Sequence, residues 1–287
     1  MRVLNLALLA GMALFAQHEK VEPTWLYRQV PALPQRQTDL STDSCHYTAI
    51  FGEGDVETRF PKSVARFGKL VIDAHGFCKP IEYPRSEELF FVLQGKGTLQ
   101  YGEQSHSLQQ KDFAYVPPNI RHSLSNASDQ PLQLVITTVR IAEQMVLSAP
   151  GKLEVANLAE LREQTVEGHP DSVLYKLLIG PRTAARDRIN AAYAVADFFL
   201  MDFAPGGTNL PHHHEVAEEI YLVLDGEGQM VAGGGTDGVE GLHSAHAGDA
   251  YYFRPNCTVG FYNQSQSPAK AHILAVRVFV PMPKNPD

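Results

Sequence analysis

The feature that most constrains this chain is an internal repeat. Residues 88–97 (ELFFVLQGKG) align without gaps to residues 219–228 (EIYLVLDGEG), with five identities in ten at an offset of 131 residues. Residues 126–140 match residues 263–277 with six identities in fifteen at an offset of 137, and the glycine-rich loop at 233–238 accounts for the difference. Two copies of one unit in a chain of 287 residues predict two similar domains.

Each copy has the pattern of a β protein. Short apolar runs, such as Leu89–Leu93 and Tyr221–Leu224, are followed by glycine turns and then by a second apolar run. Short strands with regular turn signals favour a sandwich or a barrel. Between the copies, residues 155–163 have helical spacing with Asn157 as a candidate N-cap, and residues 183–192 are a second helical candidate.

Composition excludes some classes of protein and raises one question. With 44% hydrophobic and 20% charged residues, the chain is not of the disordered type. The net charge of −8 disfavours nucleic acid as a partner. Twelve histidines beside one tryptophan point to a metal or acid–base role, which composition alone does not decide.

The first sixteen residues have the architecture of a signal peptide. Arg2 precedes an apolar run from Val3 to Phe15, and the sequence turns polar at Gln17. A leader over 1–16 predicts a secreted or periplasmic protein; the alternative is a buried N-terminal helix. The run is too short to span a bilayer, and no other segment matches its length without a charge, so we expect no membrane association after leader removal.

Export would permit disulfide bonds. The chain has three cysteines, so at most one bond forms within it. Cys45 with Cys78 is the most economical pair, and it leaves Cys257 over.

Two histidines and one glutamate have the spacing of a metal site. His212 and His214 are two residues apart, so on an extended strand both rings point to one face, whereas His213 points to the other. Glu219 follows on the next predicted strand and completes a two-histidine, one-carboxylate set. This set suits iron and also manganese, with nickel, copper and zinc as further options. The alternative is that the three histidines are polar surface residues at a strand entrance.

These residues resemble the motifs of the cupin superfamily, and the duplication resembles a bicupin. The family's first motif is matched in full by Gly206, His212, His214, Glu219 and Gly226. The resemblance implies an all-β fold of two tandem cupin barrels (double-stranded β-helix, or jelly roll) with a short helical connection. The expected domains are an N-terminal barrel over 46–141, a linker over 142–172 and a C-terminal barrel over 173–282.

The second motif of the C-terminal copy is incomplete. Arg254 stands at the family's proline position and Val259 at its histidine position, so the fourth ligand is missing. His272, Cys257 or a water molecule is a candidate substitute.

The N-terminal copy departs in the opposite way. Ile81 and Tyr83 replace the two histidines of the first motif, whereas Glu88 and His122 keep their places. Without imidazoles a metal site is not expected here, and Glu88 and His122 could instead meet as a hydrogen-bonded pair. Cys78, near the lost histidines, is either a ligand or an ordinary buried or disulfide-bonded cysteine.

The resemblance implies an exported metal-binding bicupin. Our leading hypothesis is an oxygenase that acts on a small polar or phenolic substrate through the C-terminal barrel. The alternatives are a non-catalytic bicupin that binds a small molecule or sugar, and a cupin isomerase, lyase or decarboxylase. No catalytic acid or base is assigned. Tyr221, Tyr251 and Arg254 are candidates to line the pocket, and a homodimer is an expected assembly.

Overall fold

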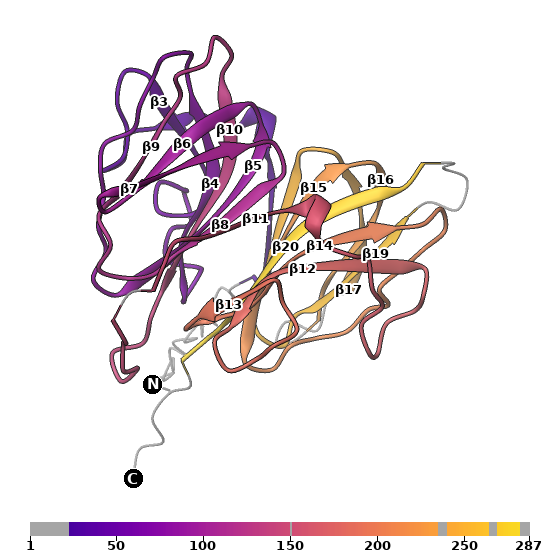
Figure 1. Cartoon of the computed structure of the whole chain (residues 1–287). Helices are drawn as coiled ribbons and strands as arrows, with labels where there is room; N and C mark the ends of the chain where they lie inside the picture. The colour runs from indigo at the N-terminus through magenta and orange to yellow at the C-terminus, as the bar shows by residue number, and fades with distance from the viewer. Residues whose placement is uncertain (1–22, 150, 235–239, 264–268, 282–287) are drawn as a thin grey trace, which may run out of the picture.

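The strands of the chain form two barrels that lie side by side (Figure 1). The computed structural model describes residues 23–149, 151–234, 240–263 and 269–281, and these ranges are built mainly of β-strands. Each barrel has a seven-stranded and a three-stranded sheet. The expected fold, two tandem β-barrels, is therefore confirmed. The predicted leader over 1–16 lies outside the described residues.

The first barrel has the strand orders β11-β8-β5-β10-β4-β3-β2 and β7-β6-β9. Its strands are β2 (Gln35–Arg36), β3 (Cys45–Gly52), β4 (Val64–Ile72), β5 (Ser86–Gln94), β6 (Lys96–Tyr101), β7 (Gln104–Gln109), β8 (Asp112–Val116), β9 (His122–Ser125), β10 (Leu132–Arg140) and β11 (Glu154–Asn157).

The second barrel repeats this arrangement, with the orders β1-β18-β15-β20-β14-β12-β13 and β17-β16-β19. Its strands are β1 (Trp25–Gln29), β12 (Val173–Pro181), β13 (Ile189–Ala192), β14 (Val195–Phe203), β15 (Ala217–Asp225), β16 (Glu227–Gly233), β17 (Glu240–His246), β18 (Asp249–Phe253), β19 (Thr258–Asn263) and β20 (Ala271–Phe279).

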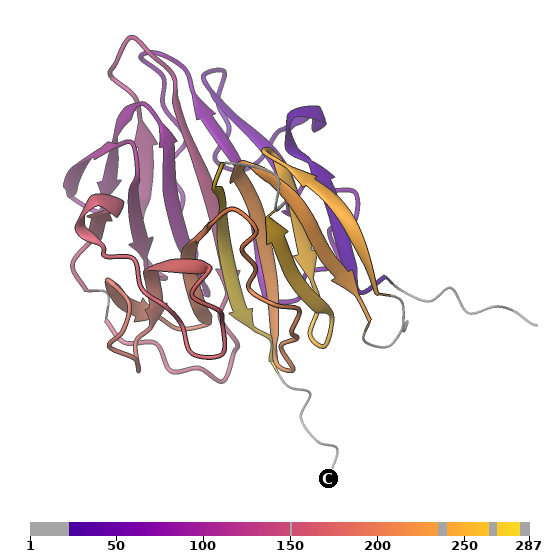
Figure 2. The same ribbon diagram turned by 90° about the vertical axis from the view of Figure 1, so that its right-hand side faces the viewer.

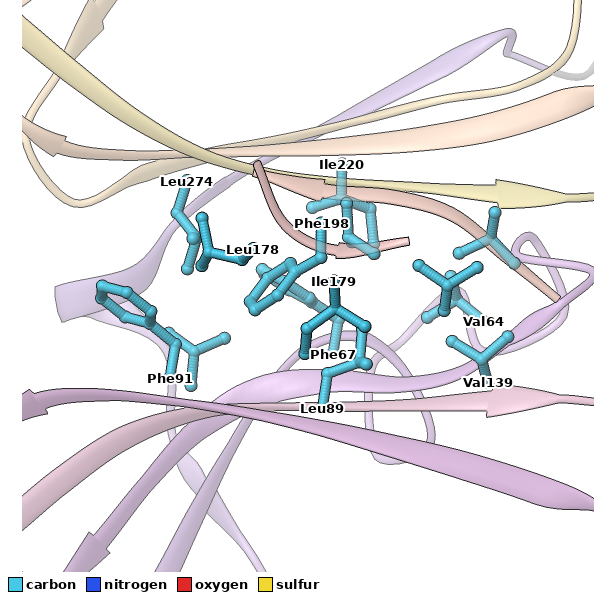
Figure 3. Packing of buried hydrophobic residues seen from close by; sticks show 14 of the residues in the cluster. Val64, Phe67, Leu89, Phe91, Val139, Leu178, Ile179, Phe198, Ile220 and Leu274 are labelled. Carbon is cyan, nitrogen blue, oxygen red and sulfur yellow. The ribbon is translucent and has the colours of Figure 1, made fainter. Parts of the chain in front are cut away.

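Alternation along the strands of the large sheets sends side chains to two different cores. On β5, Leu89 and Phe91 pack between the barrels, whereas Phe90 and Val92 pack inside the first barrel, as the two-residue period of a strand requires. Figure 3 shows the core between the barrels, where the rings of Phe91 and Phe198 lie 6.5 Å apart. Strand β5 is thus buried on both faces over most of its length.

Two buried glutamates at equivalent places in the repeat tie the barrels together. Glu218 of the second barrel accepts hydrogen bonds from three backbone N–H groups of the first barrel, those of Lys62 (2.9 Å), Ser63 (2.8 Å) and Val64 (2.6 Å). It also accepts one from the hydroxyl of Tyr252 in its own barrel (2.6 Å). Glu87 of the first barrel accepts the equivalent groups: Tyr193 (2.7 Å), Ala194 (2.8 Å), Val195 (3.0 Å) and Tyr115 (2.9 Å). In the sequence, Glu87 and Glu218 directly precede Glu88 and Glu219, whose side chains point into their own barrels.

The segment between the two barrels differs from its prediction. Residues 155–163 do not form an α-helix: Glu154–Asn157 is strand β11, which pairs with β8 of the first barrel, and a single 3-10 turn (η2) follows at Leu158–Glu160. Asn157 caps this turn, as expected. The prediction of a helix over 183–192 is also wrong, because turns there lead into β13. Pairing with distant strands overrides the local helical spacing.

The N-terminal described segment crosses to the other barrel. Strand β1 pairs with β18 of the second barrel, and a second 3-10 turn (η1, Val30–Ala32) leads from it toward the first barrel. Figure 2 shows the barrels from the side.

The expected disulfide is present. Cys45 and Cys78 are bonded, which also removes Cys78 as a metal ligand, and Cys257 is a buried thiol. Among the described residues, none of the helical turns has the length and apolar character needed to cross a bilayer.

Candidate metal centre

The three residues singled out from the sequence come together at one end of the second barrel. His212 precedes β15 and forms a two-way backbone bridge with Val259 on β19, with N···O distances of 2.9 and 2.8 Å. His214 lies two residues further on, and Glu219 points from β15 into the barrel. One donor atom from each of His212, His214 and Glu219 lies within 4.8 Å of the others, whereas His213 is exposed.

His212, which forms the backbone bridge, has the tautomer that a metal ligand needs. His212 Nδ1 lies 2.8 Å from the carbonyl oxygen of Leu210, and because a carbonyl only accepts, Nδ1 carries the proton and Nε2 carries the lone pair. Burial lowers the pKa of His212 below its usual value, against the opposing effect of Glu219. His212 is thus held as the neutral imidazole that a metal requires.

The carboxylate of the set is buried and ionised. Burial raises the pKa of Glu219, but His214, Arg277 and His212 together lower it below its usual value. Its Oε2 atom is buried and has no partner in good hydrogen-bond geometry; its nearest polar neighbour is His214 Nε2 at 3.2 Å, which helps to lower the pKa of the carboxyl group. A buried carboxylate oxygen with only one poorly aligned imidazole beside it is costly, and a cation at the meeting point of the three donors would satisfy it. The residues present therefore fit a divalent metal.

Charged side chains surround the three donors. Arg277 on β20 faces Glu219 in the strand register, and its Nη1 lies 3.2 Å from His214 Nδ1. Its other terminal nitrogen donates to Asp197, which also contacts Arg186. The guanidinium group of Arg277 helps to keep the Glu219 carboxylate ionised. Asp197, which contacts both Arg277 and Arg186, holds Arg277 in position.

A small cavity adjoins the three residues. Its volume is about 40 Å³, and its lining includes Arg277, Tyr175 and Tyr221 as well as the three donors. This is room for an ion and about one or two water molecules. The hydroxyl of Tyr175 is buried there without a hydrogen-bond partner. The predicted pocket residue Tyr221 is thus present, whereas Tyr251 and Arg254 are not in the lining.

A larger cavity lies elsewhere. A groove of about 1020 Å³ opens between the barrels and is lined mainly by aliphatic residues with lysines and acids at its edges. It contains none of the three donors. The smaller cavity is the candidate functional site, because convergent polar groups and perturbed pKa values mark such sites better than volume does.

Neither protein residue expected to replace the fourth ligand reaches the site. His272 faces Asp202 and Asp225, at 3.5 and 3.7 Å, on the groove between the barrels. Cys257 lies with its sulfur 3.5 Å from the carbonyl oxygen of Gly233. Among the described residues, the metal-type group consists of His212, His214 and Glu219 alone.

At the equivalent position of the first barrel, two protein side chains bond to each other. His122 Nε2 lies 2.5 Å from Glu88, and both side chains are buried, which confirms the expected pair. Thr138 donates to the other oxygen of Glu88 at 2.7 Å. Tyr83, which stands at the position of one of the two missing histidines, donates a hydrogen bond to Asp39. The described part of this barrel offers no group of metal ligands.

Sequence reasoning missed two residues beside the donors, His169 and Arg277. The ring of His169 lies 5.0 Å from that of His212. No motif marks His169, because it comes from the linker; Arg277 is visible in the sequence as an identity between the two copies.

Comparison with a family model supports the duplication. The model described as a cupin domain matches the chain twice, over residues 71–138 and 199–277. A curated but uncharacterised protein of Methanocaldococcus jannaschii is 28% identical over 50 residues, which are 17% of this chain and 40% of that protein. The match thus spans about two fifths of that relative.

Solved structures share the fold over nearly the whole chain. A putative glyoxylate-induced protein from Pseudomonas aeruginosa has 15% identity and a TM-score of 0.72, covering 93% of this chain and 95% of that one. Protein Ylba from E. coli has 14% identity and a TM-score of 0.67, covering 94% and 97%. An oxalate decarboxylase from Lactobacillus farciminis, solved as a formate complex, has 10% identity and a TM-score of 0.62, covering 92% and 87%. At such identities the likeness concerns the fold.

Proposed function

Because the chain belongs to the cupin domain family and carries two copies of its barrel, we propose that it is a metal-dependent enzyme whose second barrel holds the metal. His212, His214 and Glu219 are its ligands, and iron or manganese is the preferred ion. The observation that carries the proposal is the buried, ionised Glu219, whose Oε2 has no hydrogen-bond partner beside two imidazoles.

The proposed substrate is a small polar molecule. When bound, the metal supplies Lewis-acid activation of a substrate oxygen. The protein holds His212 as a neutral imidazole through Leu210 and keeps Glu219 ionised. A cavity of about 40 Å³ favours small polar substrates over phenolic ones, since a ring needs more room than one or two waters.

The proposed reaction is oxygenation, because a two-histidine, one-carboxylate face leaves positions open for substrate and oxygen. A second candidate is decarboxylation or a related lyase reaction. It is favoured by Arg277, whose positive charge lies next to His214 and suits an anionic substrate. The likeness to an oxalate decarboxylase supports this candidate at the level of fold.

We also propose that the protein is exported. The leader over 1–16 motivates this, and the Cys45–Cys78 disulfide fits an oxidising compartment. Intact-mass analysis of the protein recovered from a host with a secretion pathway should give a chain that lacks the first sixteen residues and two thiol hydrogens. Recovery of the full-length chain from the reducing cytoplasm alone would contradict export.

Metal analysis tests the metal centre. The wild type, grown with mixed transition metals, should retain about one metal per chain, and the double variant His212→Ala, His214→Ala should retain none. The matched control is His213→Ala, because His213 is exposed and lies between the two ligands. Equal and negligible metal in the wild type and the double variant would overturn the proposal.

Turnover assays separate the reactions. Metal-loaded protein should be screened with small keto acids, dicarboxylates and catechols for oxygen consumption and for release of carbon dioxide. Oxygen uptake supports the oxygenase, and carbon dioxide without oxygen uptake supports the decarboxylase. Ligand binding without turnover under any metal would instead indicate a non-catalytic binding protein.

A further inference from the structure

The metal site lacks a donor on the side of Val259. This residue pairs through its backbone with His212, so its side chain lies on the same face of the strand pair as that of His212. It is a buried member of the apolar cluster inside the second barrel. Strand β19 therefore offers hydrocarbon where a fourth ligand would complete the set.

A histidine from the loop between η2 and β12 lies beside His212. The loop folds back on the second barrel, because Gln164 and Tyr175 exchange two backbone hydrogen bonds of 3.0 and 2.8 Å. It turns at Gly168, whose φ of +86° suits glycine. His169 follows at once and lines the same cavity as the three donors.

The ring of His169 is oriented like that of a ligand. Its Nδ1 lies 2.7 Å from the carbonyl oxygen of Asn209, so Nδ1 holds the proton and Nε2 the lone pair, as in His212. Asn209 is itself fixed, because its side chain accepts from the backbone N–H of Phe261 at 2.8 Å and donates to the Tyr221 hydroxyl at 3.0 Å. A buried residue whose side chain is held by two hydrogen bonds thus sets the tautomer of His169.

The spacing of the rings also fits. The centres of the His169 and His212 rings are 5.0 Å apart, and those of His212 and His214 are 4.9 Å apart. Two imidazoles that share an ion at about 2.1 Å have their ring centres roughly 5 Å apart. His169 is not among the described residues whose donor atoms all lie within 4.8 Å of one another, so ligation requires an inward movement of its loop.

We propose that His169 is the fourth ligand of the metal site and replaces the histidine that is absent at Val259. The inference rests on the proposed function, because it concerns the same site. It assigns a role to the segment between the barrels: the linker closes over the second barrel and completes its ligand set. Loss of His169 then weakens metal binding without removing the site.

The test uses cobalt(II) as the probe with the full-length chain. Chelator competition measures affinity, and X-ray absorption counts the imidazoles bound to cobalt. The wild type should show three imidazoles. His169→Ala and His169→Phe, which keeps an aromatic ring, should each show two imidazoles and bind cobalt at least about tenfold more weakly. Even the loss of a group that only hydrogen-bonds to a ligand lowers metal affinity about 10- to 100-fold. His213→Ala, a matched exposed control, should behave as wild type.

The outcomes distinguish this inference from the proposed function. If either folded His169 variant binds cobalt with wild-type affinity and the wild-type imidazole count, the fourth-ligand role is overturned while the three-residue site stands. If the wild type itself binds no cobalt, the proposed function fails and the inference with it. Placing a histidine on β19 in the His169→Ala chain, as Val259→His, should restore the third imidazole.

Discussion

Replacing Glu218 by glutamine should loosen the contact between the two barrels. One oxygen of Glu218 accepts the N–H groups of Ser63 and Val64, and the other accepts the Lys62 N–H and the Tyr252 hydroxyl. The hydroxyl can turn to accept from the new amide, but a backbone N–H cannot. Glutamine therefore leaves the partly buried N–H of Lys62 without an acceptor and removes the charge from the remaining bonds.

The expected cost follows from these contacts. An orphaned buried donor costs about 1–3 kcal/mol, and losing the charge weakens the other bonds by about 1 kcal/mol in total, so the free energy of unfolding should fall by roughly 3 kcal/mol. For a chain of this size that lowers the melting temperature by roughly 6–12 °C. Urea unfolding followed by circular dichroism measures the change.

The control for this experiment lies three residues away in the sequence. Glu215 is exposed, so Glu215→Gln should change the free energy of unfolding by less than about 0.5 kcal/mol. If Glu218→Gln unfolds within that same margin of the wild type, the glutamate contacts do not hold the barrels together and the reasoning is refuted.

Three further perturbations test other parts of the structure. The double variant Cys45→Ala, Cys78→Ala should lose about 4 kcal/mol of stability by the loop-entropy estimate, as measured by urea unfolding, and unchanged stability would contradict it. Burial lowers the pKa of His122, but Glu88 and its other partners raise it above its usual value; its stabilising contribution is therefore full below the unfolded pKa of about 6.5 and is lost as pH rises through the folded pKa. Glu88→Gln should flatten this fall in stability, and an unchanged pH profile would show that the pair is not responsible. His122→Ala should leave an unpaired carboxylate and cost about 3–5 kcal/mol, yet keep the wild-type metal content, since the metal belongs to the other barrel.

The sequence predicted those features that depend on local spacing. His212 and His214 share a face because a strand has a period of two, and Glu219 follows on a strand of the same copy. The repeat likewise placed Glu88 opposite His122. Such relations are fixed by chain neighbours or by the duplication.

Features that depend on distant pairing escaped prediction. The segment around Val155 has helical spacing, but its backbone pairs with β8, about forty residues earlier in the chain, and so it is a strand. His169 carries no motif and approaches His212 only because its loop folds back on the second barrel. No local pattern records either contact.

Anomalous diffraction from crystals of the metal-loaded protein tests the central claim most directly. Data collected at the absorption edge of the bound metal should give one peak per chain, within coordination distance of His212, His214 and Glu219, and none between Glu88 and His122 of the first barrel. A peak at any other protein site, or none in the second barrel of a chain shown to be saturated with metal, would contradict the account.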